Sequence, residues 1–187
     1  MTDVSVITRF DARVDALFDH LRGNVVADRV FYTASELGDW SLLWHLLGAS
    51  QGVLLRDGLE RAVRISACMG IESAVVNGGV KSLFRRSRPA ATTDRPHRLR
   101  QPKTSSFPSG HASAAFVAAA LLSDGTRAKP LFYGIAGVVA FSRVHVRIHH
   151  ASDVVGGVAV GVALGVIARR VWPLGHPPFG LAPCLQP

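Results

Sequence analysis

The sequence contains little cysteine and few acidic residues, and each shortage excludes a class of protein. Its 187 residues include two cysteines, Cys68 in an apolar run and Cys184 in a proline-rich tail, which are too few for a disulfide framework. We interpret both as free thiols. The 13 Asp and Glu residues are outnumbered by 21 Lys and Arg residues, which gives a formal net charge of +8. The first residues also lack the charged and apolar pattern of a secretory signal.

A chain this basic is unusually apolar. Hydrophobic residues make up 48% of it, and the mean hydropathy is +0.25. Low hydrophobicity is typical of disordered basic chains, so disorder is excluded for most of the length. Soluble nucleic-acid-binding proteins rarely average so apolar, so we expect no nucleic-acid partner. The composition leaves a membrane protein with basic loops, or an unusually apolar soluble domain.

Residues 1–30 predict an amphipathic helix at the N-terminus. Apolar residues recur there at helical spacing, with charged residues on the other faces: Phe10, Val14, Leu17, Leu21 and Val25. Two interpretations of this helix remain open. Either it lies on the membrane surface, or it packs against the rest of the protein.

Five strongly apolar segments follow: Trp40–Leu55, Ala62–Leu83, Ala112–Leu122, Pro130–Val146 and Ala151–Val171. A helix that spans a bilayer needs roughly 17–25 residues, so the second, fourth and fifth segments are long enough, and the first and third are marginal. The first becomes longer if Phe31–Leu37 joins it, at the cost of burying Glu36 and Asp39. We predict an all-α, multi-pass integral protein of the cell membrane. Its bundle of about five transmembrane helices occupies residues 31–172, and a disordered proline-rich tail occupies residues 173–187.

The fifth segment carries a glycine at every fourth position, at Gly157, Gly161 and Gly165. Small residues at this spacing let two helices approach closely in a bilayer. Any helix rich in glycine and alanine produces such spacings by chance, so the pattern predicts close packing without naming a partner. It permits a homo-oligomer but does not require one.

A first cluster of basic residues ends the second apolar segment. Lys81 and Arg88 stand seven residues apart, about two helical turns, so they project from one side if the helix continues. Two such cations form a receptor for a doubly charged anion; the alternative is a positive flank that anchors a helix end among lipid headgroups. The loop at residues 85–103 then concentrates seven Lys and Arg residues against one acidic residue. It either attracts anionic headgroups to the site or binds phospholipid nonspecifically.

A second cluster opens the third apolar segment. Pro108 and Ser109 before an alanine-rich run mark a helix N-terminus, where free N–H groups attract a phosphate oxygen. Gly110 permits a close approach of the backbone. His111 then stands beside the anion, where it can give a proton to a leaving oxygen. The alternative is an ordinary capped helix with an incidental histidine.

A third cluster lies between the fourth and fifth segments. Arg143 can hold a phosphate through two parallel hydrogen bonds. Asp153 follows His149 by four residues, one helical turn, so its carboxylate can fix the tautomer of the imidazole and leave the other ring nitrogen as a nucleophile. The alternatives are a basic interface segment that ends in a helix cap, and a metal site. The metal site would use His145, His149 and His150.

In this order, the three clusters resemble the signature of the type 2 phosphatidic acid phosphatase superfamily: Lys-x6-Arg-Pro, Pro-Ser-Gly-His and Ser-Arg-x5-His-x3-Asp. Every position matches, namely Lys81, Arg88, Pro89, Pro108, Ser109, Gly110, His111, Ser142, Arg143, His149 and Asp153. The resemblance covers roughly Ala62–Val171. It implies a metal-independent membrane phosphatase without a cofactor. Its substrate would be a polyprenyl-linked phosphate such as decaprenylphosphoryl 5-phosphoribose or undecaprenyl diphosphate, or else phosphatidic acid or phosphatidylglycerol phosphate.

The resemblance also implies a role for each residue. His149 attacks phosphorus and forms a phosphohistidine, Asp153 orients His149, and His111 protonates the leaving alcohol and then helps to activate water. The phosphoryl oxygens are held by Lys81, Arg88, Ser109, Gly110 and Arg143. Two alternatives remain: a vanadium-dependent haloperoxidase-like enzyme, and a membrane protein that only binds a lipid headgroup. The short apolar chain disfavours the first, and the complete catalytic set disfavours the second.

Overall fold

The computed structural model describes residues 5–90, 99–100 and 104–176, and this part of the chain contains helices and loops but no strand. The prediction of an all-α protein is therefore confirmed for the described residues. The helices are α1 (Val6–Asp19), α2 (Val25–Leu37), α3 (Leu42–Leu54), α4 (Gly58–Ser73), α5 (Gly110–Leu122), α6 (Lys129–His145) and α7 (Ala151–Val171).

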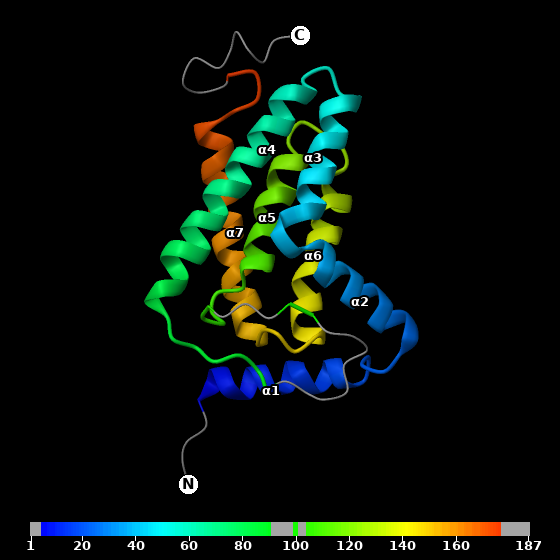
Figure 1. Ribbon diagram of the computed structural model, residues 1–187, viewed down its shortest axis with the longest axis vertical. Helices are drawn as coiled ribbons and strands as arrows, with labels where there is room; N and C mark the ends of the chain where they lie inside the picture. The colour runs from blue at the N-terminus through cyan, green and yellow to red at the C-terminus, as the bar shows by residue number, and fades with distance from the viewer. Residues whose placement is uncertain (1–4, 91–98, 101–103, 177–187) are drawn as a thin grey trace.

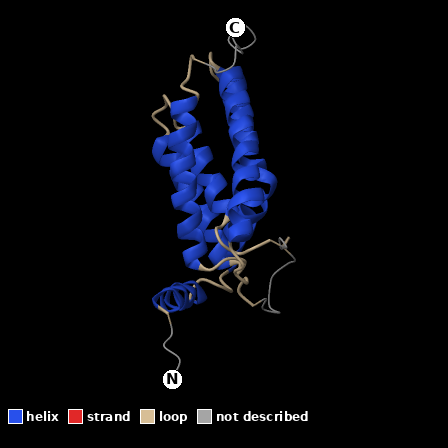
Figure 2. Cartoon of the chain, turned by 90° about the vertical axis from the view of Figure 1, so that its left-hand side faces the viewer, coloured by secondary structure: helices blue, strands red, loops and turns tan. Residues whose placement is uncertain are grey.

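Helices α3 to α7 run along the long axis of the molecule, and α1 lies across one end of them (Figures 1 and 2). α5 is the central helix, in contact with α4, α6 and α7. Ten of its 13 residues are buried, and most of these are alanines. Because alanine side chains are short, the surrounding helices can pack close to the α5 backbone.

The glycine series in α7 is the clearest example of this close packing. A Cβ atom added at Gly157 would lie 2.4 Å from the carbonyl oxygen of Ser109, and one at Gly161 would lie 2.4 Å from that of Ser113. At Gly165 the nearest atom would be the Cβ of Ala120, at 2.8 Å. The helix against which this glycine series packs is thus α5 of the same chain.

The N-terminal region forms two helices where the sequence predicted one over residues 1–30. Gly23 adopts a φ of +84° between them, and the side chain of Asn24 accepts hydrogen bonds from the N–H groups of Val26 and Ala27 to begin α2. Helix α1 packs against α6 and α7. It buries the acidic side chain of Asp11 there, while much of its apolar face stays exposed, at Val6, Ile7, Phe10 and Leu17.

Two of the predicted apolar segments have different ends in the structure. Phe31–Leu37 does not extend α3, because Trp40 and Ser41 adopt φ angles of 55° and 57° in a short turn at Asp39–Ser41. In the second segment, α4 continues through a wider turn of helix at Ala74–Gly79 into a single tight turn at Val80–Leu83. That tight turn carries Lys81.

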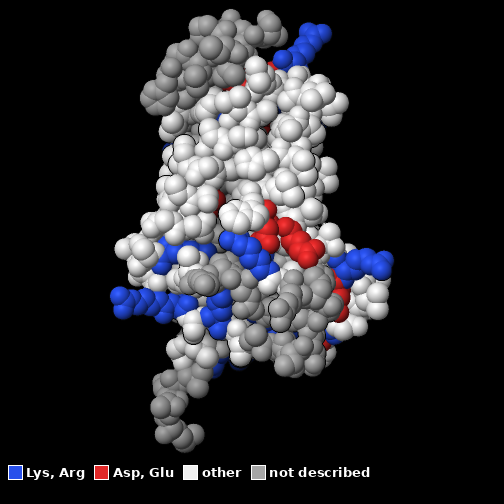
Figure 3. All heavy atoms as spheres, in the orientation of Figure 1, with Lys and Arg blue, Asp and Glu red and all other residues white. Residues whose placement is uncertain are grey.

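The outer surface of the bundle is apolar along its middle. Large exposed hydrophobic side chains occur on four of its helices, including Leu46, Val53, Ile71, Phe141 and Ile167. On the face in Figure 3, charged side chains gather near the two ends and leave the middle almost free of them. Among the described residues, α7 alone is long and apolar enough to cross a bilayer by length and composition, and α5 is a shorter apolar helix.

Candidate active site

The three sequence clusters meet at the end of the bundle that α1 covers. Lys81 follows α4, Ser109 begins α5, Arg143 lies in the last turn of α6, and Asp153 lies in the first turn of α7. His149 stands in the loop between α6 and α7. The side chains of Lys81, Ser109, Arg143, His149 and Asp153 are all buried there.

The turn after α6 explains the spacing between Arg143 and His149. The carbonyl oxygen of Arg143 accepts hydrogen bonds from the N–H groups of Ile148, at 3.1 Å, and His149, at 3.0 Å. Arg147 adopts a φ of 52° in this turn. The chain therefore folds back on the end of α6 and brings the imidazole of His149 next to the guanidinium groups of the cluster.

The imidazole of His149 lies between an acid and a cation. Its Nδ1 is 3.6 Å from Oδ2 of Asp153, and its Nε2 is 3.0 Å from Nη1 of Arg88. Burial lowers the pKa of His149, and the charges of Arg143, Arg88 and Lys81 lower it further, although Asp153 acts in the opposite direction. The ring is thus neutral at physiological pH, as a nucleophile requires.

The carboxylate of Asp153 is held by three donors. Ser106 donates its hydroxyl to Oδ2 at 2.5 Å, the N–H of His150 donates to the same oxygen at 2.9 Å, and Arg86 donates to Oδ1 at 2.6 Å. These bonds fix both oxygens of a carboxylate that is fully buried. Asp153 therefore presents Oδ2 to His149 in one orientation.

Arg86 and Asp11 are members of this site that the sequence reasoning missed. Arg86 bridges two acids, because its Nη2 lies 2.6 Å from Oδ2 of Asp11. Asp11 also accepts hydrogen bonds from the backbone N–H of Ser152, at 2.8 Å, and from the hydroxyl of Ser152, at 2.9 Å. Helix α1 is thereby tied to the residues around Asp153. In the sequence, Asp11 is an acid on one face of the N-terminal helix. Residue spacing alone does not show whether that face is buried or exposed to solvent.

The Pro-Ser-Gly-His segment begins α5 against the start of α7. Ser109 caps the helix through its side chain, which accepts the N–H of Ala112, and its own N–H donates to the carbonyl oxygen of Asp153 at 2.9 Å. A Cβ atom at Gly110 would lie 3.5 Å from Nζ of Lys81 and 3.0 Å from Oδ1 of Asn77. The lack of a side chain at Gly110 therefore lets Lys81 and Asn77 approach this helix N-terminus closely.

His111 stands beside an acid that the sequence did not assign to the site. Its Nε2 is 3.1 Å from Oδ1 of Asp39, which lies in the turn between α2 and α3. Burial acts to raise the pKa of Asp39, but His111 and the charges of Arg143 and Arg100 outweigh it, so this pKa is lowered. Asp39 is therefore a carboxylate that stabilises a proton on His111. In the sequence, Asp39 stood out only as an acidic residue that would be unfavourable to bury in a longer first segment.

Arg143 and Arg88 are anchored by different parts of the chain. Arg143, 1% exposed, donates through Nη1 to the hydroxyl of Ser35 on α2. Arg88 donates to backbone carbonyl oxygens of Ile148, Thr104 and Ser105 at 3.1–3.3 Å. These anchors hold two guanidinium groups around His149.

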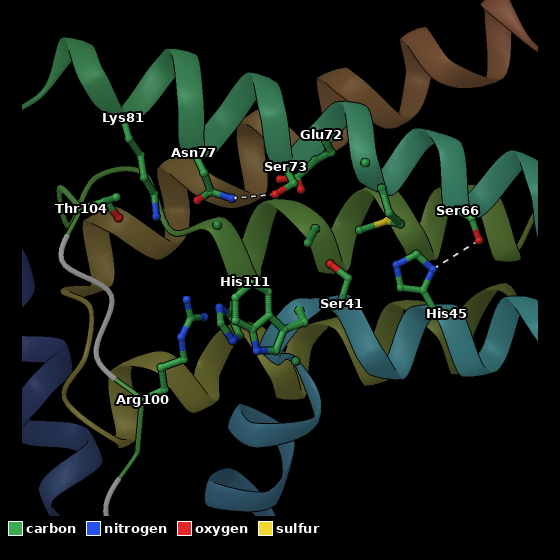
Figure 4. A pocket seen from close by; sticks show the side chains of 16 residues that line it. Ser41, His45, Ser66, Glu72, Ser73, Asn77, Lys81, Arg100, Thr104 and His111 are labelled. Atoms are coloured by element: carbon green, nitrogen blue, oxygen red, sulfur yellow. Dashed lines mark hydrogen bonds between the residues drawn. The ribbon is translucent and has the colours of Figure 1, made fainter.

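A cavity of about 450 Å³ opens from this site between α3, α4 and α5 (Figure 4). Lys81, Gly110 and His111 line one end of it, and His45 and Ser66 line the other. Arg100, the described basic residue of the loop after position 90, also lines it and lies 4.1 Å from the centre of the Trp40 ring. Arg95, Arg98 and Lys103, the other basic residues in this part of the loop, lie outside the described residues.

No group of three His, Cys, Asp or Glu side chains that could hold a metal ion occurs in the described part of the chain. His145, which the sequence placed with His149 and His150 as a candidate ligand, contacts Oδ1 of Asp28 through Nε2 at 2.7 Å. Arg22 also donates to the carbonyl oxygen of His145 at 2.9 Å. These contacts give His145 a role in joining α2 to the end of α6.

The sequence model of the PAP2 superfamily matches residues 61–175. The chain is 38% identical over 142 residues to decaprenylphosphoryl-5-phosphoribose phosphatase of Mycobacterium tuberculosis, which covers 73% of this chain and 76% of that protein. It is 35% identical over 102 residues to a lipid A 1-phosphatase of Porphyromonas gingivalis, which covers 52% of this chain and 20% of that protein.

Two crystal structures share the fold. LpxE of Aquifex aeolicus superposes with a TM-score of 0.70 at 23% identity, over 91% of this chain and 98% of that one. A transmembrane phosphatidylglycerolphosphate phosphatase of Bacillus subtilis superposes with a TM-score of 0.66 at 24% identity, over 89% and 86% of the two chains. The arrangement of helices around the motif residues is thus one found in membrane phosphatases.

Proposed function

Because this chain belongs to the PAP2 superfamily, we propose that it is a membrane phosphatase that hydrolyses a lipid phosphate monoester or diphosphate through a phosphohistidine at His149. The names of its relatives, a polyprenyl phosphoribose phosphatase and a lipid A 1-phosphatase, support a lipid phosphate as the substrate. The exposed apolar side chains along the bundle support a membrane location. We propose that α3 to α7 are embedded in the bilayer, with the motif residues at one membrane face.

The observation that carries this proposal is the position of His149. Nδ1 faces the carboxylate of Asp153 at 3.6 Å, so the proton on the ring stays on that side. The lone pair of Nε2 then points toward Arg88, 3.0 Å away. A phosphoryl group bound by Arg88 would meet a nucleophile whose tautomer is already fixed.

The reaction proceeds in two steps. In the first, Nε2 of His149 forms a bond to phosphorus as the bond from phosphorus to the leaving oxygen breaks, and His111 donates a proton to that oxygen. In the second, water attacks the phosphohistidine, His111 accepts a proton from the water, and the bond between Nε2 and phosphorus breaks. Inorganic phosphate leaves, and both histidines return to their starting states.

The cations of the site stabilise the charge on the transferring group. We propose that Lys81, Arg88 and Arg143 bind the phosphoryl oxygens, with Ser109 and the N–H of Gly110 at the start of α5. Phosphoryl transfer requires mainly positioning and such electrostatic stabilisation, so these residues account for catalysis without a metal ion. Asp39 lies 3.1 Å from His111 and supports its role as the acid.

The experiment that tests this function traps the intermediate. The purified protein in detergent, with EDTA, is mixed with a short-chain lipid phosphate labelled with ³²P and quenched in base, which preserves phosphohistidine. We expect label on the chain and metal-independent release of phosphate, both lost in His149→Ala and both kept in His150→Ala, the matched neighbour. Hydrolysis that persists in His149→Ala would contradict the proposed mechanism.

A further inference from the structure

Helix α1 has an exposed apolar side. Val6, Phe10 and Leu17 lie along one side of the helix, because spacings of four and seven residues bring side chains into line. Their exposed fractions are 72%, 43% and 66%. This row is separate from the side of α1 that buries Asp11 and packs against α6 and α7. A row of exposed apolar side chains indicates a surface that meets an apolar partner.

The apolar row is joined to the outer surface of the bundle. Phe18 lies between the row and the side of α1 that carries Asp11. It contacts Phe141 of α6, with 6.3 Å between the ring centres. Phe141 is 56% exposed and is one of the apolar side chains on which the proposed membrane location rests. Because α1 lies across one end of the bundle (Figures 1 and 2), its apolar row lies where that outer surface ends.

The charges of α1 suit an anionic membrane surface. The exposed arginines Arg9 and Arg13 lie beside the apolar row, on the side of the helix away from Asp11. The acids of α1 are each bound by arginine: Asp11 by Arg86, Asp15 by Arg22, and Asp19 by Arg22 and Arg147. A helix with arginines beside an apolar side lies among lipid headgroups, where its apolar side chains reach the acyl region and its guanidinium groups reach lipid phosphates.

The inward side of the same helix is connected to the catalytic residues. Asp11 accepts hydrogen bonds from Nη2 of Arg86 at 2.6 Å and from the backbone N–H of Ser152 at 2.8 Å. Arg86 in turn donates to Oδ1 of Asp153 at 2.6 Å. If α1 lifts from the end of the bundle, its carboxylate moves away from Arg86 and Ser152. A bilayer that binds the outer side of α1 opposes this movement.

We propose that α1 docks on the headgroup layer of an anionic bilayer, and that this docking holds Asp153 in its catalytic orientation through Asp11 and Arg86. The partner is the bilayer itself and not the lipid that is hydrolysed. The effect on catalysis rests on the proposed function, whereas the docking of α1 can be measured without any reaction. Anionic lipid should therefore speed the hydrolysis of a water-soluble phosphate as well as of a lipid phosphate.

The first measurement locates α1 relative to the bilayer. With Cys68→Ser and Cys184→Ser, a nitroxide spin label is attached to Leu17→Cys or to Ala16→Cys, an exposed position outside the apolar row that serves as the matched control. In nanodiscs of phosphatidylcholine and phosphatidylglycerol, we expect the label at position 17 to collide mainly with oxygen and the label at position 16 with a water-soluble nickel complex. Equal access of the nickel complex to both would overturn the docking. Spin–spin broadening at position 17 would overturn it too, because a second copy of the chain would then cover this side.

The second measurement tests the effect of docking on catalysis. Hydrolysis of p-nitrophenyl phosphate is followed in nanodiscs with and without phosphatidylglycerol. We expect kcat of the unaltered protein to be about 10-fold higher with the anionic lipid, because a fixed α1 keeps the catalytic residues in position. Phe10→Ser with Leu17→Ser should lose this gain, and Arg9→Gln with Arg13→Gln should lose most of it. Ile167→Ser, an exposed apolar position of α7 near the opposite end of the bundle, serves as the control and should keep it.

A double-mutant cycle tests the route through Arg86. In Arg86→Ala, which lacks the contact with Asp153, Phe10→Ser with Leu17→Ser should cause no further loss of kcat. An additive loss would overturn the coupling through Arg86. A kcat that is equal in the two lipid mixtures would overturn the effect of docking on catalysis. If the unaltered protein hydrolyses no phosphate in any lipid, the proposed function fails, while the spin labels still decide whether α1 docks.

Discussion

The two ends of the helical bundle both bury charged side chains, but they arrange them differently. At the end opposite α1, Asp124 binds two cations, Arg64 at 2.9 Å and Arg169 at 2.6 Å. At the end that α1 covers, Lys81, Arg88 and Arg143 surround one histidine, and Lys81 lines a cavity beside it.

This difference separates buried charges that join helices from buried charges that form a binding site. Around Asp124 each arginine is in direct contact with the carboxylate, and none of these side chains lines the cavity in Figure 4. Such pairs join α4, α7 and the turn after α5. At the motif end, three cations lie near one another around His149 with Asp153 as the neighbouring acid, and a bound anion would lower the electrostatic cost of this grouping. The grouping of these cations around His149, beside a cavity that Lys81 lines, indicates a binding site more than their burial does.

The largest expected effect is at the motif end. Asp153→Asn keeps the size of the side chain but removes the charge that, in the proposed mechanism, orients and stabilises His149. We expect kcat for phosphate release to fall about 10³-fold or more. Thermal unfolding in detergent should change little by comparison, because Arg86 keeps its contact with Asp11. A variant that unfolds without a loss of kcat per folded molecule would show that Asp153 is structural, like Asp124.

The next effect tests the contact between α1 and the site. Arg86 touches Asp153 at 2.6 Å and does not line the cavity, so we interpret it as a positioning residue. Arg86→Ala should lower kcat about 10²-fold and leave KM nearly unchanged, because a misplaced Asp153 lets the imidazole of His149 rotate. Arg86→Lys should recover part of the loss.

Two further variants sharpen this prediction. Asp11→Asn should show a smaller loss of kcat in the same direction, since Asp11 acts on Asp153 through Arg86. Arg85→Ala, at the exposed neighbouring position, should leave both constants unchanged. A rise in KM with unchanged kcat in Arg86→Ala would mean that Arg86 binds the substrate directly.

The opposite end should respond in stability and not in catalysis. Asp124→Asn leaves the buried guanidinium of Arg64 without its carboxylate. We expect the free energy of unfolding to fall by about 3 kcal/mol, measured by thermal or denaturant unfolding in detergent. The kcat of the folded fraction should stay within about twofold. A large loss of kcat in this variant would remove the distinction between the two ends.

The sequence predicted the local parts of this structure well. Apolar runs with abrupt polar ends fixed α5 and α7 to within two residues, and the motif spacing identified the side chains that meet around His149. The break between α2 and α3 was not predictable in the same way. Trp40 and Ser41 adopt a positive φ there, and neither tryptophan nor serine favours that conformation.

What the sequence could not give was the partner of each long-range contact. Arg86 and Asp11 are 75 residues apart, and Asp11 and Ser152 are 141 residues apart. No periodicity connects residues at such separations; the packing of α1 across the end of the bundle does. For the same reason the glycine series in α7 indicated a close contact, but only the fold identified α5 as the other helix.

The smallest expected effect is a shift in pH dependence. The pKa of His149 is lowered by burial and by nearby cations, one of which, Arg88, lies 3.0 Å from Nε2. In the proposed mechanism His149 attacks only when unprotonated, so the acid limb of kcat/KM should lie below the ordinary histidine pKa of about 6.5. Arg88→Gln removes a positive charge, which raises the pKa of His149 and moves this limb to higher pH by up to about one unit.

The control for this shift keeps the charge and changes the shape. Arg88→Lys loses the planar guanidinium group, so it should lower kcat/KM, but its acid limb should stay close to that of the unaltered protein. A phosphate monoester itself ionises near pH 6, so each variant profile is divided by the unaltered one to cancel the substrate. Arg169→Gln, at the opposite end, should give a flat ratio. A flat ratio for Arg88→Gln as well would mean that the charges around His149 bind phosphate without holding the imidazole neutral.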